Sequence, residues 1–340
     1  MFSLAQKSLY VAALDLWIDS MRSRARSYVS HAHSDHAREH ELIISSEANA
    51  KICRLRFGNR RERKVQTSLL PRAAPKAAPV FETHAFNEPW MLGEHRLTLF
   101  SAGHVLGSSQ LMIEGEDGSF VYTGDFKLEP SFSCEAPEVK RCDVVLMECT
   151  YGRPQYVFPP RAEVAAAMVA FAQKTFEDGA VPIFYAYSLG KAQEAMAILG
   201  AAGIALMVHG AVHSIAKVYE ECGVALPPYQ HYDAELVDGT QAIIWPPSGR
   251  NIPAGARERA TRSAVLTGWA LDKSAKFRYG SNAAFALSDH ADYPSLLRYI
   301  ELAQPKKVLL NHGWRDFAYT LRKRGVDAQY LEANEQLALF

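Results

Sequence analysis

The sequence predicts an α/β protein, and two features of its 340 residues support this prediction. Residues 1–150 contain several short apolar runs that are typical of strands. Residues 161–222 instead alternate strand-like runs with amphipathic helical runs, which is the pattern of a parallel sheet with crossover helices. The length allows one large domain or two smaller ones, and the change in pattern favours two.

The strand-rich first part is expected to contain short strands joined by turns. EGEDG at residues 114–118 is expected to turn the chain between two strands of a hairpin. The run at 143–150 is apolar enough to be buried on both faces of a sheet. The expected strands of this part are residues 26–30, 96–100, 109–113, 119–126 and 143–150.

The middle and the end of the chain alternate strands with helices. The first helix is expected to end at Gly179, and the second to begin with Ser188 as its cap. Further strands are expected at 181–187, 204–208, 242–245, 264–269, 283–287 and 306–311, and helices at 161–179, 188–200, 212–222, 293–303 and 314–325.

The charges of the chain balance, because 37 basic and 37 acidic residues give a formal net charge of zero. The total charge therefore does not indicate a nucleic-acid partner, although a local patch could still bind one. Residues 54–64 form a basic stretch, in which Arg60 and Arg61 are candidate phosphate contacts. A solvated surface helix explains the same stretch, so both interpretations stay open. A proline- and alanine-rich segment at 71–90 is the candidate linker.

The cysteines and the apolar runs limit the cellular setting. The five cysteines include no CxxC pair, which argues against a disulfide framework and against a cysteine-based zinc site. They favour a reducing compartment, and we expect a cytoplasmic protein. No apolar run is long enough to span a bilayer and no signal peptide is recognisable, so no membrane association is expected.

Residues 31–37 read HAHSDHA, which places three histidines and an aspartate within six positions. Imidazole and carboxylate groups are ligands of zinc and manganese, so this stretch indicates a metal-binding loop for one ion or for two. Further candidate ligands follow expected strands: His104 in SAGHVLGS, Asp125 in YTGDF and His312 in LLNHG. Because α/β sheets gather their sites at the carboxyl ends of strands, we expect these residues to meet the loop.

HAHSDHA followed by SAGHVLGS, TGDF and NHG resembles the metallo-β-lactamase fold, an αββα sandwich. The resemblance implies a site for two divalent metal ions, zinc first and manganese as the alternative. It implies that His31, His33 and His104 hold the first ion, that Asp35, His36 and His312 hold the second, and that Asp125 bridges both.

Three further stretches resemble the β-CASP nucleases of the same superfamily: LMECTYG at Glu148, LSDHADY at His290 and LLNHG at His312. YSLGKAQE also resembles the loop of those enzymes that lies near the nucleic-acid backbone, which implies that Ser188 and Lys191 contact the substrate.

The resemblance also implies a division of the chain. A β-CASP α/β domain over residues 158–280 is expected to be inserted into a metallo-β-lactamase domain formed by residues 1–157 and 281–340. The independent change in pattern after residue 150 agrees with this division.

The implied activity is metal-dependent hydrolysis of a phosphodiester. The two metals would activate a hydroxide and neutralise the charge that develops on the phosphoryl group. His290 would act as the general acid that protonates the departing oxygen, and Glu148 would orient His290. Asp35, Glu148 and His290 are therefore the expected catalytic residues.

The chain as a whole looks most like the bacterial exonucleases associated with ATP-dependent DNA ligase. This resemblance implies a DNA exonuclease in DNA repair, with DNA as its nucleic-acid partner and a functional association with the ligase and a helicase. An RNA nuclease is the alternative, because β-CASP RNA nucleases carry histidine in the third motif, as this chain does at His312. A small-molecule metallo-hydrolase would need no inserted α/β domain, and an inactive binding subunit would not keep all seven ligands and His290.

Overall fold

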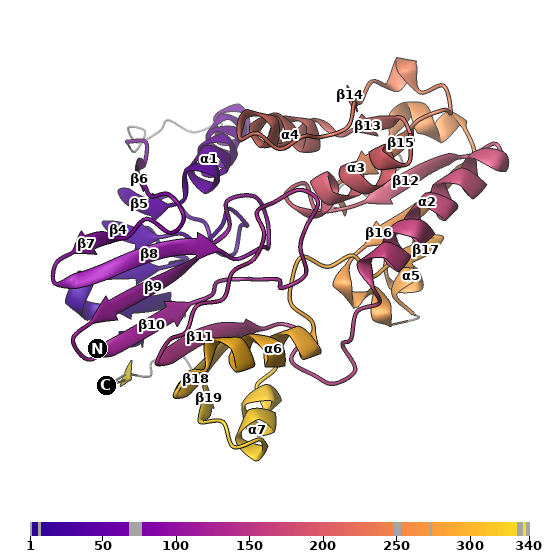
Figure 1. Ribbon diagram of the computed structural model, residues 1–340. Helices are drawn as coiled ribbons and strands as arrows, with labels where there is room; N and C mark the ends of the chain where they lie inside the picture. The colour runs from indigo at the N-terminus through magenta and orange to yellow at the C-terminus, as the bar shows by residue number, and fades with distance from the viewer. Residues whose placement is uncertain are drawn as a thin grey trace. The chain divides into compact units, whose positions relative to one another are not determined.

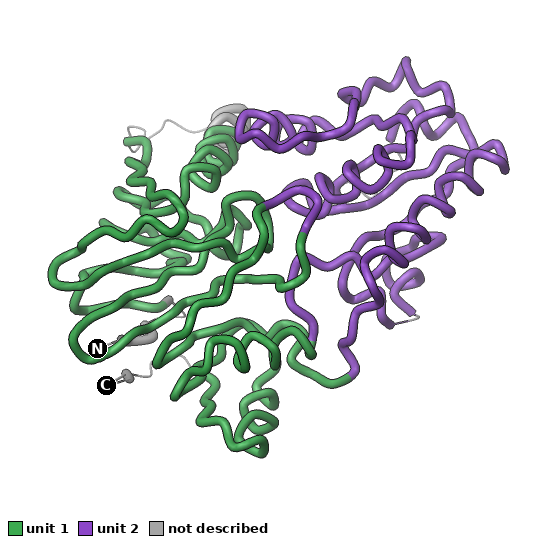
Figure 2. Tube along the Cα trace, in the orientation of Figure 1, with its two compact units in different colours: residues 1–130, 135–154, 293–340 green, residues 131–134, 155–292 purple. Residues whose placement is uncertain are grey.

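The computed structural model describes residues 2–5, 8–67, 77–247, 253–272, 274–331 and 336–337. The chain forms two compact units, drawn in two colours in Figure 2. Unit 1 comprises Met1–Pro130, Glu135–Pro154 and Tyr293–Phe340, and unit 2 comprises Ser131–Cys134 and Gln155–Asp292. The predicted insertion over 158–280 falls within unit 2, while its boundaries as a functional domain stay a prediction.

Unit 1 contains two sheets, each with seven strands among the described residues. The first sheet has the order β20-β1-β2-β3-β4-β5-β6, and the second has the order β19-β18-β11-β10-β9-β8-β7. The first consists of β1 (Phe2–Ala5), β2 (Ser8–Val11), β3 (Leu16–Ile18), β4 (Arg26–Tyr28), β5 (Leu42–Ser45), β6 (Val80–Thr83) and β20 (Gln336–Leu337). The second consists of β7 (Trp90–Leu92), β8 (His95–Ser101), β9 (Ser109–Gly115), β10 (Gly118–Tyr122), β11 (Val144–Cys149), β18 (Lys307–Gly313) and β19 (Ala328–Tyr330).

A shared apolar core holds the two sheets of unit 1 together. It joins Leu16 and Ile44 of the first sheet to Leu99, Phe120 and Leu146 of the second, all of them buried. The helices α1 (Glu47–Thr67), α6 (Tyr293–Ala303) and α7 (Asp316–Lys323) lie outside the sheets (Figure 1). Helix–sheet–sheet–helix layering is the αββα sandwich that the motifs predict, so the predicted α/β fold class is confirmed.

Unit 2 contains a single sheet of six parallel strands among the described residues, in the order β14-β13-β15-β12-β16-β17. Its strands are β12 (Val181–Tyr185), β13 (Leu206–Val208), β14 (Gln230–His231), β15 (Ala242–Trp245), β16 (Thr261–Leu266) and β17 (Ala283–Phe285). The helices are α2 (Arg161–Glu177), α3 (Lys191–Ala201), α4 (Gly210–Glu221) and α5 (Ala275–Arg278). The predicted parallel sheet with crossover helices is confirmed.

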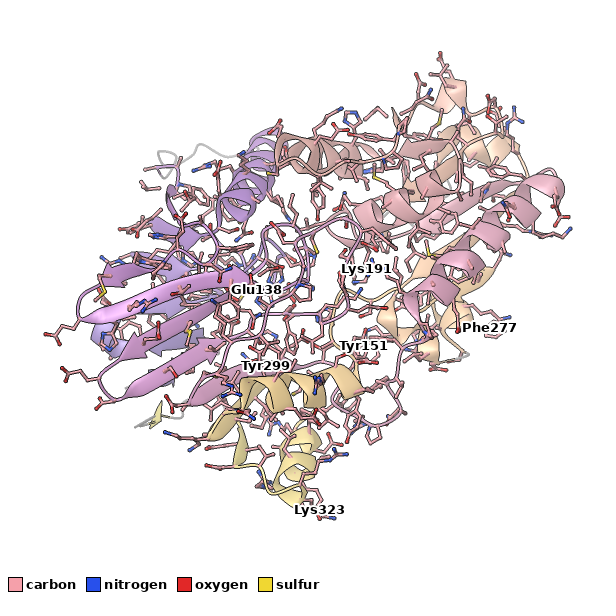
Figure 3. The ribbon with its side chains drawn as sticks, in the orientation of Figure 1. Glu138, Tyr151, Lys191, Phe277, Tyr299 and Lys323 are labelled. Atoms are coloured by element: carbon pink, nitrogen blue, oxygen red, sulfur yellow. The ribbon has the colours of Figure 1, made fainter. Side chains whose placement is uncertain are left out.

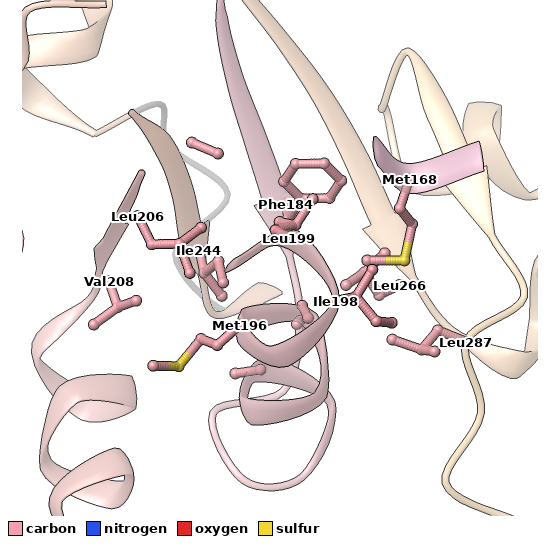
Figure 4. Packing of buried hydrophobic residues seen from close by; sticks show 14 of the residues in the cluster. Met168, Phe184, Met196, Ile198, Leu199, Leu206, Val208, Ile244, Leu266 and Leu287 are labelled. Atoms are coloured by element: carbon pink, nitrogen blue, oxygen red, sulfur yellow. The ribbon is translucent and has the colours of Figure 1, made fainter. Parts of the chain in front are cut away.

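The core of unit 2 forms where the helices pack on this sheet. Figure 4 shows Met168 of α2 and Met196 of α3 among Phe184, Ile244 and Leu266 of the strands, and all five are buried. Short 3-10 helices occur at Ala12–Leu14 in unit 1 and at Ala234–Leu236, Ala254–Glu258 and Gly268–Leu271 in unit 2.

Two sequence predictions about local structure are wrong. The segment predicted as a linker contains strand β6, which pairs with β5 in parallel at the sheet edge; residues 71–76 lie outside the described residues. The helix predicted to start at Ser188 begins at Lys191, because Gly190 takes a φ of 87° and its N–H is bonded to the Gln193 side chain at 2.8 Å. Among the described helices, none is long and apolar enough to cross a bilayer.

Candidate metal centre

The candidate ligands of unit 1 sit where strands end. HAHSDHA follows β4, His104 follows β8 and Asp125 follows β10. His312 lies near the carboxyl end of β18, where the chain adopts a φ of 44°. Strands from both sheets therefore deliver imidazole and carboxylate groups to one edge of the sandwich.

Four of these side chains form one tight group. The His31, His33, His104 and Asp125 ligand atoms all lie within 4.8 Å of one another. His104 Nε2 is 3.0 Å from His33 Nδ1, and Asp125 Oδ2 is 3.6 Å from His31 Nε2. Three imidazoles and one carboxylate at this spacing suit a tetrahedral zinc ion or a similar divalent cation.

Two buried nitrogen atoms indicate that the site fits a metal. Among the described residues, neither His31 Nε2 nor His36 Nε2 has a hydrogen-bond partner. Burying such an atom without a partner costs free energy. Both atoms face the Asp125 carboxylate, with His36 Nε2 3.4 Å from Oδ2. Cations bound beside this carboxylate would satisfy both nitrogens and the carboxylate.

Asp19, which the sequence interpretation did not single out, fixes how two of these histidines carry their protons. Its Oδ2 accepts from His36 Nδ1 at 2.7 Å and from the Ser30 hydroxyl. The Ser30 oxygen, having donated its proton, accepts from His31 Nδ1 at 3.0 Å. Both imidazoles therefore present an unprotonated Nε2 to the site when neutral, as metal ligands require.

Asp19 itself is held firmly at the end of β3. Its Oδ1 accepts from the Ser30 N–H at 2.7 Å, and the Tyr122 hydroxyl donates to its Oδ2 at 2.8 Å. The signal that could have found it is its position, since a buried carboxylate directly after an apolar strand needs partners.

The pKa values of His31 and His36 are shifted in opposite directions by their surroundings. Burial, with the neighbouring His36 and His104 imidazoles, lowers the pKa of His31 well below its ordinary value. Burial would also lower the pKa of His36, but the Asp125 and Asp19 carboxylates outweigh it and raise that pKa well above the ordinary value. A metal ion must displace the His36 proton, so metal binding is expected to strengthen as the pH rises.

The loop that carries His104 is locked by its own backbone bonds. The Ser108 hydroxyl oxygen accepts from the N–H groups of His104 and Val105, each at 3.1 Å. Gly107 has a φ of 71°, and a Cβ there would lie 2.5 Å from the Asn49 nitrogen. Only glycine allows this close approach, which explains the GxxxG spacing of SAGHVLG around His104.

The Asp125 loop is fixed by Glu148, the expected orienting carboxylate. Glu148 is buried at the end of β11, and its Oε1 accepts from the Phe126 N–H at 2.9 Å. Its Oε2 accepts from the Thr150 hydroxyl at 2.5 Å. Glu148 therefore braces the residue that follows Asp125, and its pairing with His290 stays a prediction.

The remaining ligands predicted for a second ion are more open. The His312 ring stacks on the His36 ring with centroids 5.0 Å apart, but the His312 side chain is exposed. Gly313 lies so close to the Cys149 carbonyl that a Cβ would overlap it, and the Trp314 N–H donates to that carbonyl at 3.1 Å. Asp35 is exposed. The structure thus brings His36 and His312 together and leaves Asp35 on the surface of the loop.

The other predicted site residues lie elsewhere in the chain. His290 follows β17 in unit 2, and Ser188 precedes helix α3. Lys191 starts α3, and its ammonium group is buried in an ion pair with Asp289. The predicted contact of Ser188 and Lys191 with the substrate stays a prediction. Arg60 and Arg61 lie in α1, and their side chains fall outside the described ones.

The sequence is similar to those of known proteins. Residues 281–334 match a family described as a Zn-dependent metallo-hydrolase RNA specificity domain. A protein of Opitutus terrae named "Probable DNA ligase" is 40% identical over 333 residues, which cover 97% of this chain and 31% of that protein. An "RNase J-like protein" of Methanocaldococcus jannaschii is 23% identical over 281 residues and 67% of each chain. Together these matches indicate similarity to β-CASP nucleases of the metallo-β-lactamase fold.

A solved structure agrees with the fold. The crystal structure of a protein of unknown function from Enterococcus faecalis superposes with a TM-score of 0.62 over 92% of this chain and 80% of that one, at 15% identity. The chain spans about a third of the length of the Opitutus relative, with 31% of that protein covered. The similarity to that relative extends over both units, and the family name of the matched segment agrees with a divalent-metal site.

Proposed function

We propose that this chain is a two-metal phosphodiester hydrolase that acts on nucleic acid, and that its favoured activity is a DNA exonuclease in DNA repair. The observation that carries the proposal is the close group of His31, His33, His104 and Asp125, with His36 Nε2 3.4 Å from the same carboxylate oxygen that faces His31. This donor set fits hydrolytic metals, and β-CASP relatives include a protein named for RNase J.

In this proposal His31, His33 and His104 hold the first ion, Asp35, His36 and His312 hold the second, and Asp125 contributes to both. When bound, the two ions would supply Lewis acidity, which would make a bound water a better nucleophile and offset charge on the phosphoryl oxygens. The exposed Asp35 and His312 would complete the second position when the ion binds.

His290 donates a proton to the departing oxygen, because the oxygen of a nucleotide is a poor leaving group when unprotonated. Glu148 orients His290 and favours its protonated form. The Ser188 hydroxyl contacts a phosphate of the substrate. This role is open to Ser188 because Gly190, and not Ser188, occupies the N-cap position of α3.

DNA is favoured because the relative that matches nearly the whole chain is named a probable DNA ligase. We propose, on the same ground, a functional association with an ATP-dependent DNA ligase, and with a helicase as a further repair partner. An RNA nuclease is the second candidate, since residues 281–334 match an RNA specificity domain.

End-labelled single- and double-stranded DNA and RNA, offered with zinc or with manganese, test this proposal. Products that shorten one nucleotide at a time from DNA are the expected result, with Asp125→Asn inactive. The matched control is Asp117→Asn, which changes an exposed aspartate in the turn before β10. Faster cleavage of RNA would favour the second candidate, and no cleavage of any polynucleotide would refute both.

A further inference from the structure

A buried ion pair beside His290 is not explained by the family motifs, and we propose that its members, Lys191 and Asp289, position His290 for proton donation. The inference rests on the proposed function, and it deepens it by naming two positioning residues for the general acid. It also gives Lys191 a different role from the predicted substrate contact.

The pair joins two distant parts of unit 2. Lys191 is the first residue of α3 and is labelled in Figure 3, whereas Asp289 follows β17. The Lys191 ammonium donates to Asp289 Oδ1, and the two residues are 7% and 6% exposed. Lys191 Nζ also lies 5.3 Å from the centre of the exposed Tyr187 ring. The Lys191 ammonium group therefore interacts with both a carboxylate and an aromatic ring of the protein itself.

The same carboxylate oxygen faces His290. Asp289 Oδ1 lies 3.7 Å from His290 Nε2, so it is shared between the lysine and the histidine. The backbone of His290 is fixed as well, because its N–H donates to the Ser288 hydroxyl at 3.1 Å and its carbonyl accepts from that hydroxyl at 3.2 Å. The histidine side chain is 19% exposed, so it can still reach a reacting group.

This arrangement has a direct chemical consequence. A carboxylate beside an imidazole restricts the orientation of the ring, so that its N–H can be directed at a departing oxygen. A buried carboxylate keeps its charge only when a partner compensates it, and Lys191 is that partner. Loss of either member should therefore weaken proton donation by His290 without weakening the binding of the substrate.

Two substrates with different leaving groups test the inference. A single-stranded DNA oligonucleotide loses a nucleotide oxygen that needs a proton, whereas the p-nitrophenyl ester of thymidine 5′-monophosphate releases nitrophenolate without one. Lys191→Met and Asp289→Asn should each lower kcat on the oligonucleotide roughly 10- to 100-fold, a part of the roughly 10²–10⁴-fold effect of a general acid, with KM nearly unchanged. Turnover of the nitrophenyl ester should stay near that of the unchanged protein, and Lys191→Arg should restore part of the oligonucleotide activity.

The matched control is Glu194→Gln. Glu194 lies on the same helix and pairs with Arg161 in unit 2, with the Ser133 hydroxyl donating to it at 3.0 Å. This change also breaks a buried ion pair, so it should lower the melting temperature without making turnover depend on the leaving group. If a single variant does not fold, the double change Lys191→Met with Asp289→Leu removes both buried charges and should give the same leaving-group-selective loss.

Three results would overturn the inference. Equal losses on both substrates would mean a merely structural pair, and unchanged kcat on the oligonucleotide would mean that the pair does not assist His290. A raised KM with unchanged kcat in Lys191→Met would mean that Lys191 contacts the substrate instead. In each case the proposed function still holds if His290→Ala loses activity on the oligonucleotide but not on the nitrophenyl ester. The proposed function itself is refuted if the unchanged protein cleaves neither DNA nor RNA.

Discussion

The two halves of the proposed metal centre differ in how far the protein alone forms them. The first half, His31, His33 and His104 around Asp125, has its ligand atoms within 4.8 Å, with His31 and His104 buried. The second half has one buried ligand, His36, beside the exposed His312 and the exposed Asp35. The structure gathers the first half closely, and we expect an ion to draw the second half together.

The supporting bonds explain this difference. The loops of the first half are braced by Ser108 at His104 and by Glu148 at the residue after Asp125. In the second half, Asp19 fixes His36, while His312 sits at a positive φ at the end of its strand. Preorganised ligands bind more tightly because less freedom is lost on binding. We therefore expect the first ion to bind before the second.

The largest expected effect comes from removing the carboxylate that both halves share. Asp125→Asn keeps the size of the side chain and removes its charge, so both ions should be lost. Hydrolysis should fall by about 10³-fold or more, as expected when preorganised charge stabilisation is removed. Metal analysis and rate measurements on the same sample check this, and full activity in Asp125→Asn would exclude the metal mechanism.

A pair of matched alanine variants separates the two halves. His104→Ala should abolish the tight ion, and His312→Ala should leave the tight ion in place and weaken only the second. Competition with a fluorescent zinc chelator measures both affinities. Equal weakening of one class of site in both variants would mean that the two residues serve the same ion.

Removal of the carboxylate behind His36 should have a smaller effect. Asp19→Asn leaves the metal ligands in place but no longer fixes their ring nitrogens, which typically costs about 10- to 100-fold in metal affinity. The control is Asp15→Asn. Asp15 is an exposed turn residue with a φ of 44°, and its Oδ1 accepts a hydrogen bond from the Tyr10 hydroxyl. Wild-type zinc affinity in Asp19→Asn would remove Asp19 from the site.

The smallest expected effect concerns a buried histidine outside the ligand set. Burial lowers the pKa of His40 to about 4, and its Nδ1 accepts from the Arg24 N–H at 3.1 Å. The unfolded chain takes up this proton near pH 6.5 and the folded chain does not, so stability is full above pH 6.5 and falls as the pH drops toward 4.

His40→Asn keeps the acceptor and removes the titration. The free energy of unfolding of the metal-free protein is measured in urea at pH 7 and at pH 5. Between these pH values it should fall by about 2 kcal/mol more in the unchanged chain than in His40→Asn. An equal loss in both proteins would assign the acid sensitivity to other groups, such as the metal ligands.

The sequence predicted the strand-end positions of the ligands because short motifs and apolar runs are local signals. Asp19 was missed because a single aspartate after a three-residue strand carries no such signal until Ser30, His36 and Tyr122 surround it. The partner of Lys191 is 98 residues away at Asp289, a pairing that no local pattern specifies. The predicted Ser188 cap is wrong because Gly190, with a φ of 87°, takes the N-cap position and α3 begins at Lys191.

The most direct test of the central claim is a zinc titration of the metal-free chain followed by native mass spectrometry. The unequal halves predict two ions per chain at saturation, with a one-ion species accumulating first. A chain that never takes up more than one ion, or that passes to two ions without an intermediate, would contradict a two-metal centre with one preformed half.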